Sequence, residues 1–283
     1  MKGGVRMIKT YVYKYKLTTL TPVIISPRQN NAFYTDALID ETDMKYMNGY
    51  KIIYPFYRYG EYERFKPDEA RYYIPGSSIK GALTAGMNED NRKPLALFVD
   101  DISVDNNRIE IIALEKFQYA SSLKSEPMGQ IIPKFNTFFP GVGVEALKKG
   151  TELYGALRYE VDKSVEELFK GCGKRFKGKL ERYKAQLEIY EGRLKDLAAQ
   201  DVNANEAKNK TLQKIDDLLE YCKGLVSGEN KEIYIFLGGF KGLIRSVVIG
   251  GSELDINKLD SAVFVSENNR PFGIVKIKLE SRL

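Results

Sequence analysis

Histidine is absent from the 283-residue chain. Because histidine is the usual general base near neutral pH and the commonest metal ligand, its absence excludes Ser-His-Asp triads, Cys-His pairs, HExxH zinc sites and histidine-dependent ribonuclease chemistry. Catalysis by carboxylates, lysine or tyrosine stays open. The two cysteines, Cys172 and Cys222, lie too far apart in the sequence for a CxxC zinc site or a disulfide framework, so free thiols are expected.

Long apolar runs are also missing. No stretch approaches the roughly 20 apolar residues that span a bilayer, and the first nine residues lack the apolar block of a signal peptide. The expectation is a cytoplasmic protein without a membrane partner. Hydrophobic residues at 43% and charged residues at 29% are typical of a folded globular chain. The length suits two modest domains or one domain with a large insertion.

Basic residues exceed acidic ones by 44 to 38, which gives a net charge of +6 and favours a polyanionic partner. Residues 46–73 carry ten aromatic side chains interleaved with lysines and arginines, a composition suited to single-stranded RNA. The alternative is that most of these rings pack one face of a sheet. A second basic cluster is interpreted as solvated helix surface or as a surface for RNA or an acidic partner; it comprises Lys170, Lys174, Arg175, Lys177, Lys179, Arg182 and Lys184.

Alternating β-branched and aromatic residues predict strands near both ends of the chain. Residues 5–25 predict an opening strand with a break near Pro22, and residues 232–237 predict a later strand. Residues 273–279 alternate apolar and basic side chains, which predicts a terminal strand with one side facing water or RNA.

Two strand pairs are expected between these ends. Residues 98–100 and 108–114 are interpreted as strands with a hairpin turn at residues 105–107 between them. Residues 131–139 and 153–161 are interpreted as a further strand pair around a Pro-Gly-Val-Gly segment.

Residues 165–226 differ from the rest of the chain because they contain no proline and many Lys, Glu, Leu and Ala residues. Apolar side chains recur every three or four positions over residues 180–197 and again over residues 212–225. Residues 201–205 can end the first helix. The pattern predicts a helical hairpin inserted into a β-rich domain.

Two glycine-containing segments are candidate phosphate sites. Residues 75–81, Pro-Gly-Ser-Ser-Ile-Lys-Gly, predict a loop that leads into a helix N-terminus, where backbone N–H groups and Lys80 suit a phosphate. The spacing of a Walker loop is not met. Residues 238–242, Gly-Gly-Phe-Lys-Gly, follow a predicted strand, with Arg245 nearby. Taken separately, the first segment is equally consistent with a structural turn, and the second slightly favours a structural turn.

Read in order, three segments carry a more specific pattern: YIPGSSIKGAL at residues 73–83, FVDD at residues 98–101 and LGGFKG at residues 237–242. This pattern resembles the RAMP superfamily of CRISPR effector subunits. Residues 20–25 and 271–275 are similar to the first and last strands of that superfamily. The length, the helical insert and the Pro-Phe-Gly ending most resemble subunit five of the type III-A Csm complexes.

The resemblance implies an α+β fold of ferredoxin-like (RRM-like) RAMP domains with an inserted helical hairpin, and two such units are preferred to one. The expected division is an N-terminal domain over residues 1–160, a helical insert over residues 161–228, and C-terminal strands with a glycine-rich loop over residues 229–283 that complete the second unit.

The function implied by the resemblance is non-catalytic binding of the guide RNA. The chain would cap the 3′ end of the crRNA in a type III-A interference complex, with roles in crRNA maturation and antiviral defence. Expected partners are the 3′ portion of the crRNA, the backbone RAMP subunit, the small helical subunit, target RNA indirectly and host ribonucleases. No cofactor or metal is expected. The expected RNA-binding residues are Gly76, Ser77, Ser78, Lys80, Gly81, Gly238, Gly239, Lys241, Gly242 and Arg245.

Two alternatives remain at this stage. A metal-dependent RAMP ribonuclease that processes guide RNA or cuts target RNA would use carboxylates to hold magnesium; the candidates are Asp36, Asp40, Asp100 and Asp101. A protein-docking subunit would instead recruit accessory nucleases through its helical insert.

Overall fold

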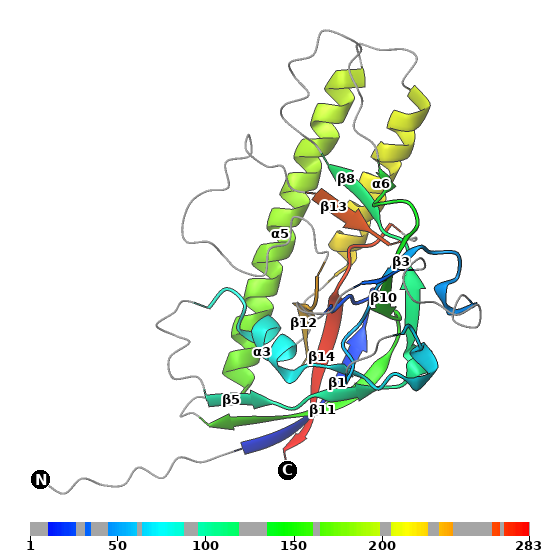
Figure 1. Ribbon diagram of the computed structural model, residues 1–283. Helices are drawn as coiled ribbons and strands as arrows, with labels where there is room; N and C mark the ends of the chain where they lie inside the picture. Colours follow the sequence, from blue (N-terminus) through cyan, green and yellow to red (C-terminus); the bar gives the residue numbers. More distant parts are fainter. Residues whose placement is uncertain are drawn as a thin grey trace, which may run out of the picture.

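The computed structural model describes residues 11–26, 32–34, 45–60, 64–87, 96–118, 135–160, 165–198, 205–225, 232–239, 262–266 and 269–282. Within these ranges the protein is a mixed α+β molecule, in which a long helical hairpin lies beside several sheets (Figure 1). Cys172 and Cys222 are buried free thiols, as the sequence predicts. None of the helices described is both long enough and apolar enough to cross a bilayer.

The main sheet has five strands in the order β12-β14-β1-β11-β5, and each neighbouring pair is antiparallel. Its strands are β12 (Glu232–Phe236), β14 (Ile274–Arg282), β1 (Tyr11–Thr19), β11 (Glu152–Glu160) and β5 (Ala96–Val99). The terminal strand predicted from the alternating pattern is confirmed, and it pairs directly with the opening strand. Strands from the two ends of the chain therefore share one sheet.

One face of the main sheet carries the largest hydrophobic core. Tyr15 and Leu17 of β1 are fully buried on this face, whereas Lys14 and Lys16 point to the other face, because side chains alternate along a strand. Two helices cover the buried face: α3 (Gly76–Thr84), through Ile79 and Leu83, and the first turns of α5 (Val165–Ala198). The face that carries the lysines lies outside this core.

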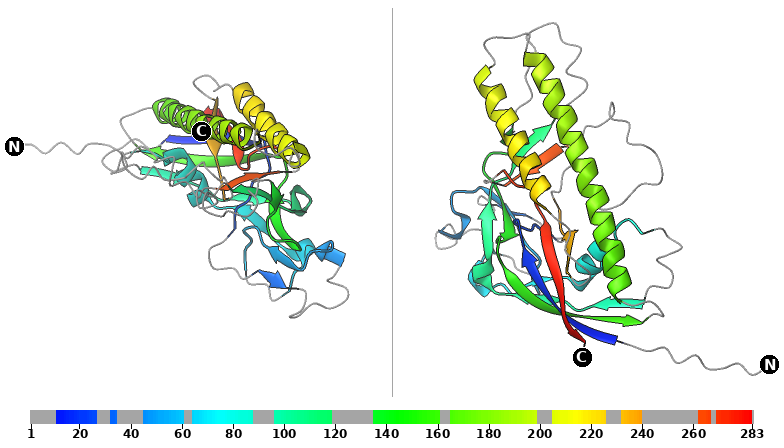
Figure 2. Two further views of the ribbon diagram at one scale, coloured as in Figure 1. Left: turned by 90° about the horizontal axis from the view of Figure 1, so that it is seen from above. Right: turned by 180° about the vertical axis from the view of Figure 1, so that it is seen from behind.

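The helical hairpin predicted for residues 165–226 is confirmed as α5 and α6 (Asn205–Gly224), which run side by side (Figure 2). Their apolar stripes form a second core, with Leu187, Tyr190 and Leu218 among its buried members. A small sheet packs against this core; its order is β13 (Ala262–Val265), β8 (Glu115–Gln118), β9 (Asn136–Thr137). The hairpin is thus part of the packed molecule over most of its length.

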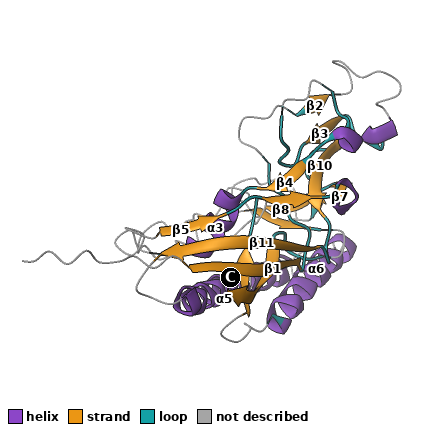
Figure 3. Cartoon of the chain, turned by 90° about the horizontal axis from the view of Figure 1, so that it is seen from below, coloured by secondary structure: helices purple, strands orange, loops and turns teal. Residues whose placement is uncertain are grey.

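Two further sheets complete the fold. One has the order β2 (Phe33–Tyr34), β3 (Ile52–Tyr54), β10 (Val142–Leu147), β7 (Ile109–Ile112), and β2 and β3 extend away from the side occupied by the helices (Figure 3). The other pairs β4 (Tyr72–Ile74) with β6 (Ile102–Val104). Single turns of 3₁₀ helix lie at Pro67–Glu69 and Asn106–Arg108.

A buried carboxylate connects these sheets. Glu145 of β10 accepts hydrogen bonds from the Phe56 N–H, at 2.8 Å, and from the Tyr72 hydroxyl of β4. Burial raises the pKa of Glu145, although these two hydrogen bonds and the charge of Arg58 oppose the shift. Because β4 leads directly into α3, this network holds the segment that positions α3.

The strand pairings predicted between residues 98 and 161 are wrong. β5 pairs with β11 and β7 pairs with β10, so residues 105–107 do not form a hairpin turn between them. β11 pairs with β1 and β5 instead of with residues 131–139, of which residues 131–134 lie outside the described ranges. The side-chain period of a strand indicates which face is buried but not which strand lies beside it.

The α+β class agrees with the expectation, whereas the ferredoxin-like (RRM-like) topology and the division into three segments stay predictions. The strand order adds one constraint on that division: β12 and β14, from the predicted C-terminal segment, lie in the same sheet as β1 and β11 from the predicted N-terminal domain.

Candidate nucleic-acid interface

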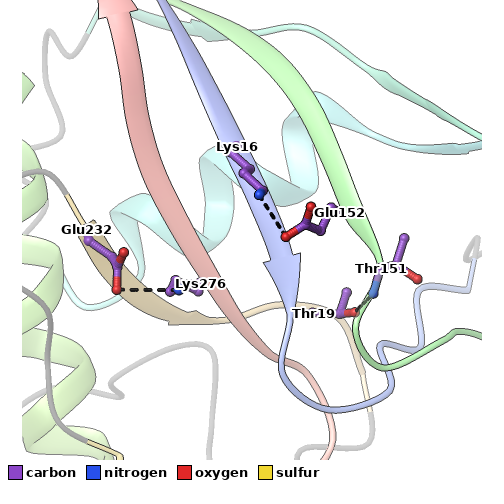
Figure 4. A network of polar contacts seen from close by, with 6 residues as sticks. All are labelled: Lys16, Thr19, Thr151, Glu152, Glu232 and Lys276. Atoms are coloured by element: carbon purple, nitrogen blue, oxygen red, sulfur yellow. Dashed lines mark hydrogen bonds and ion pairs between the residues drawn. The ribbon is translucent and has the colours of Figure 1, made fainter.

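The face of the main sheet opposite α3 and the first turns of α5, here called the open face, gathers basic and aromatic side chains. The strand register places Lys16 of β1 between Tyr154 of β11 and Lys278 of β14, and Arg158 of β11 beside Phe98 of β5. Figure 4 shows part of this face, with α3 passing behind the sheet. The open face comprises Lys14, Lys16, Phe98, Glu152, Tyr154, Arg158, Glu232, Lys276, Lys278 and Glu280.

Two ion pairs cross the strands of the open face. Lys16 Nζ lies 2.7 Å from Glu152 Oε1, and the hydrogen bond that Lys16 donates to Glu152 raises the pKa of Lys16. Lys276 Nζ lies 3.6 Å from Glu232 Oε1 (Figure 4). The open face carries five cations and three carboxylates, and this surplus of positive charge suits a polyanion.

Three of the cations on the open face are exposed: Lys14, Arg158 and Lys278. In the part of the chain that the structure describes, these three make no ion pair. A ligand can therefore bind these charges without an ion pair having to break first.

Phe98 and Tyr154 are the exposed aromatic rings of this face, with 48% and 66% of their surface accessible. Two cations lie near the Phe98 ring centroid: Lys80 Nζ at 5.9 Å and Arg158 Cζ at 5.4 Å. Lys80 belongs to α3 and reaches Phe98 because β5 is the edge strand of the sheet. An exposed ring with two cations near it can stack a base while the cations contact the phosphates of the same strand.

The predicted loop and helix at residues 75–83 are confirmed, and α3 begins at Gly76. The Gly76 N–H donates a 2.7 Å hydrogen bond to Asp101 Oδ1, and Asp101 Oδ2 accepts a hydrogen bond from the Tyr59 hydroxyl at 3.2 Å. The first amide of α3 thus already binds a carboxylate, which would repel a phosphate at the same place.

The other predicted residues of α3 differ in their surroundings. Ser77 and Gly81 are exposed, whereas Ser78 and Lys80 are half-buried. Gly81 faces open space, since an added Cβ would meet nothing within 4 Å. A Cβ on Gly76 would lie 1.9 Å from the carbonyl oxygen of Val99, so this glycine permits close packing of α3 on the end of β5.

Of the second glycine segment, Gly238 and Gly239 are described, whereas Lys241, Gly242 and Arg245 lie outside the described residues. Gly238 has φ +86°, and a Cβ there would lie 2.2 Å from the Ile24 carbonyl oxygen. That oxygen accepts a 2.7 Å hydrogen bond from the Gly239 N–H. The Leu237 N–H in turn donates to the Gly273 carbonyl at 2.7 Å. Three segments singled out in the sequence therefore meet at one backbone junction.

The aromatic tract of residues 46–73 supplies core more than surface. Phe56, Phe65 and Tyr72 are fully buried. Tyr59 is partly exposed and stacks on Tyr73, with the ring centroids 3.9 Å apart. The exposed rings of the open face lie outside this tract, so the sequence tract does not identify Phe98 or Tyr154. Phe98 and Tyr154 are instead identified by their positions on the solvent-facing side of their strands.

The carboxylates considered for a metal site are not gathered in the described ranges. Asp101 is engaged with Gly76 and Tyr59, and the described residues contain no group of three His, Cys, Asp or Glu side chains placed to hold a metal ion. Asp36 and Asp40 lie outside the described residues.

Comparison with known proteins identifies no family for the chain. No family model matches the sequence, and no curated protein matches it significantly. Among solved structures, the chain is similar to one chain of the cryo-EM structure of a Csm–crRNA–target RNA ternary complex in a type III-A CRISPR-Cas system. The TM-score is 0.39 and the identity 14%, over 95% of this chain and 100% of that one. With values this low, the functional argument depends on the residues themselves.

Proposed function

We propose that this chain is an RNA-binding subunit that holds single-stranded RNA across the open face of its main sheet. The observation that carries this proposal is the exposed Phe98 ring, with Lys80 Nζ 5.9 Å and Arg158 Cζ 5.4 Å from its centroid. Stacking on such a ring tolerates any base, and the neighbouring cations neutralise phosphates. Lys80 is one of the RNA-binding residues predicted from the sequence, and it lies near the Phe98 ring.

The RNA in this proposal is the 3′ portion of the guide RNA of a type III-A CRISPR complex in the cytoplasm. The support is the pattern of residues 73–83, 98–101 and 237–242, which resembles RAMP subunits, together with the basic open face. The chain would end the filament of backbone subunits, next to the small helical subunit, and contribute to crRNA maturation and antiviral defence. Lys241 and Arg245 belong to the same proposal as phosphate ligands.

Affinity purification of the tagged chain from its native host tests this identity. RNA sequencing and mass spectrometry of the eluate are expected to recover short RNAs that share a repeat-derived 5′ tag, together with several RAMP subunits. Recovery of the chain without RNA and without such subunits would contradict the proposal.

Phe98→Ala is expected to weaken binding of single-stranded RNA by about 1–3 kcal/mol, because one stacking platform is lost. Tyr34→Ala is the matched control, since Tyr34 is 50% exposed but lies on β2, outside the open face. Fluorescence anisotropy with a labelled oligouridylate measures both variants. Equal affinities of Phe98→Ala and the wild-type chain would remove Phe98 from the RNA-binding surface.

We further propose that the chain does not itself cut RNA. Incubation of the purified protein with guide and target RNA in magnesium is expected to leave both RNAs intact. Cleavage by the wild-type chain that Asp36→Ala abolishes would establish the metal-dependent ribonuclease alternative instead.

The protein-docking alternative needs a different test from simple deletion of the hairpin. Val165, Leu168 and Phe169 at the start of α5 belong to the main core, so deletion of residues 165–226 would remove part of that core. Replacing only the tip, residues 196–208, with a short glycine-serine linker leaves those contacts in place. Loss of accessory nucleases from the purified complex with RNA binding intact would support docking through the insert.

A further inference from the structure

Helix α5 carries two parallel rows of cations with glycines between them. Lys170, Lys174 and Lys177 form one row at spacing i, i+4, i+7, and Arg175, Lys179 and Arg182 form the other at the same spacing. Gly171 and Gly178 fall between the rows, since α5 turns 100° per residue. This surface, here called the α5 track, covers residues 170–182, or about 18 Å of helix.

The three lysines of the first row lie on the side of α5 away from its buried stripe, and all three are exposed. Within the described ranges they make no ion pair, and α5 contains no acidic residue between Glu167 and Glu181. Uncompensated positive charge on an exposed helix face attracts polyanions.

The second row is held close to the body of the protein. Arg175 Nη2 donates a 2.8 Å hydrogen bond to the Leu83 carbonyl near the end of α3, which anchors α5 there. Burial lowers the pKa of Lys179, which also lies near the positive charges of Arg175 and Arg182. The two rows therefore concentrate positive charge along one stretch of helix.

On the rest of the hairpin, neighbouring glutamates compensate the charges of the lysines. Four lysines pair with glutamates three or four residues away on the same helix. The pairs are Glu181–Lys184, Glu191–Lys195, Glu206–Lys210 and Glu220–Lys223. The surplus of positive charge on the hairpin is thus confined to the part of α5 that carries the track.

Gly178 lowers the stability of α5, and no close packing contact requires a glycine at this position. Glycine in a helix interior costs roughly 0.5–1 kcal/mol relative to alanine. A Cβ on Gly178 would meet nothing within 4 Å, and one on Gly171 would meet only the flexible end of Arg175, at 3.1 Å. Neither glycine places a side chain between the two rows, and the Gly178 carbonyl accepts a 3.1 Å hydrogen bond from Arg182 Nε of the second row. A phosphate chain that follows this gap can reach both sets of cations.

We propose that the α5 track binds the phosphate backbone of single-stranded RNA, as a second RNA surface besides the open face. The inference rests on the proposed function only in taking RNA as the polyanion. The first turns of α5 pack against the other face of the main sheet, and Phe176 contacts Tyr234 and Phe236 of the edge strand β12. The cations of the two surfaces lie on different elements, so each surface can be tested by its own variants.

The charge test replaces the exposed row, as Lys170→Gln, Lys174→Gln and Lys177→Gln in one full-length chain. Binding of a labelled oligouridylate is expected to weaken at least about tenfold, and the slope of log affinity against log salt to flatten by about 2, since each lost contact with a single strand contributes about 0.7. Lys195→Gln, Lys210→Gln and Lys223→Gln is the control. It removes the same charge from paired lysines of the hairpin and is expected to bind as the wild type does.

A second test blocks the access of RNA to the gap between the two rows, and it uses Gly178→Leu. Gly192→Leu is its control, because an added Cβ at Gly192 also meets nothing within 4 Å. Leucine is the better helix former, so both variants are expected to keep or raise the melting temperature. Only Gly178→Leu is expected to weaken RNA binding, by about threefold to tenfold, because its side chain fills the path between the rows.

Wild-type affinity and salt slope in both the lysine variant and Gly178→Leu would overturn the α5 track. If Phe98→Ala loses RNA while the track variants bind normally, the proposed function stands and this inference falls; the reverse result supports the track and removes the open face. Polyglutamate serves as a second probe for the same variants. If the lysine variant loses polyglutamate binding while its RNA binding is unchanged, the track is assigned to an acidic protein. Absence of RNA binding by the wild-type chain would also overturn the proposal.

Discussion

Gly76→Ala is expected to destabilise the protein by about 3 kcal/mol, because the new Cβ has no space. It would lie 1.9 Å from the carbonyl oxygen and 2.7 Å from the carbonyl carbon of Val99. Both are backbone atoms of β5, so no side-chain rotation relieves the clash and α3 must move away from the sheet. Chemical denaturation with urea measures the change in the free energy of unfolding.

Gly81→Ala in the same helix is the control, and its expected effect has the opposite sign. Gly81 is exposed and an added Cβ meets nothing, so alanine should stabilise the protein by about 0.5–1 kcal/mol. Similar effects at the two positions would show that α3 is not held tightly against β5. Gly81→Ala is also the cleaner variant for RNA binding, since its fold stays intact.

Removal of the buried carboxylate in Glu145→Ala is expected to cost about 3–5 kcal/mol of stability. The change leaves the Phe56 N–H and the Tyr72 hydroxyl buried without their acceptor. Tyr72→Phe removes only one of these hydrogen bonds and should cost about 1–2 kcal/mol. A loss in Glu145→Ala no larger than that in Tyr72→Phe would mean that the network contributes little beyond one hydrogen bond.

Glu145 also gives stability a pH dependence of known sign. Burial raises the pKa of the folded carboxyl above its ordinary value of about 4.3, so the folded state binds this proton more tightly than the unfolded chain does. The associated stability is fully present below the unfolded pKa and is lost as the pH rises through the folded pKa. Relative to wild type, Glu145→Gln should therefore gain stability over the range above about pH 4.

Urea titrations of wild type and Glu145→Gln across this pH range check the prediction. The difference between the two free energies of unfolding isolates Glu145 from the other titrating groups, because those groups are common to both proteins. A constant difference across the range would show that the pKa of Glu145 is the same in the folded and unfolded states.

Several elements follow from local patterns in the chain. The apolar spacing of residues 180–197 and 212–225 predicts α5 and α6, and alternation predicts β1, β12 and β14. These signals work because each depends on neighbours within a few residues, where the helix and strand periods differ. The glycine and proline of residues 75–76 likewise mark the start of α3.

Strand partners and the roles of single residues needed the tertiary structure. Phe98, Arg158 and Lys80 come from three elements, and they meet because β5 lies at the edge of the sheet and α3 packs beside it. Gly76 and Gly81 look alike in the sequence, yet one is packed against Val99 and the other faces open space. Local periodicity determines which face of an element is apolar, whereas contacts between distant elements determine which polar groups are satisfied internally and which stay available to a ligand.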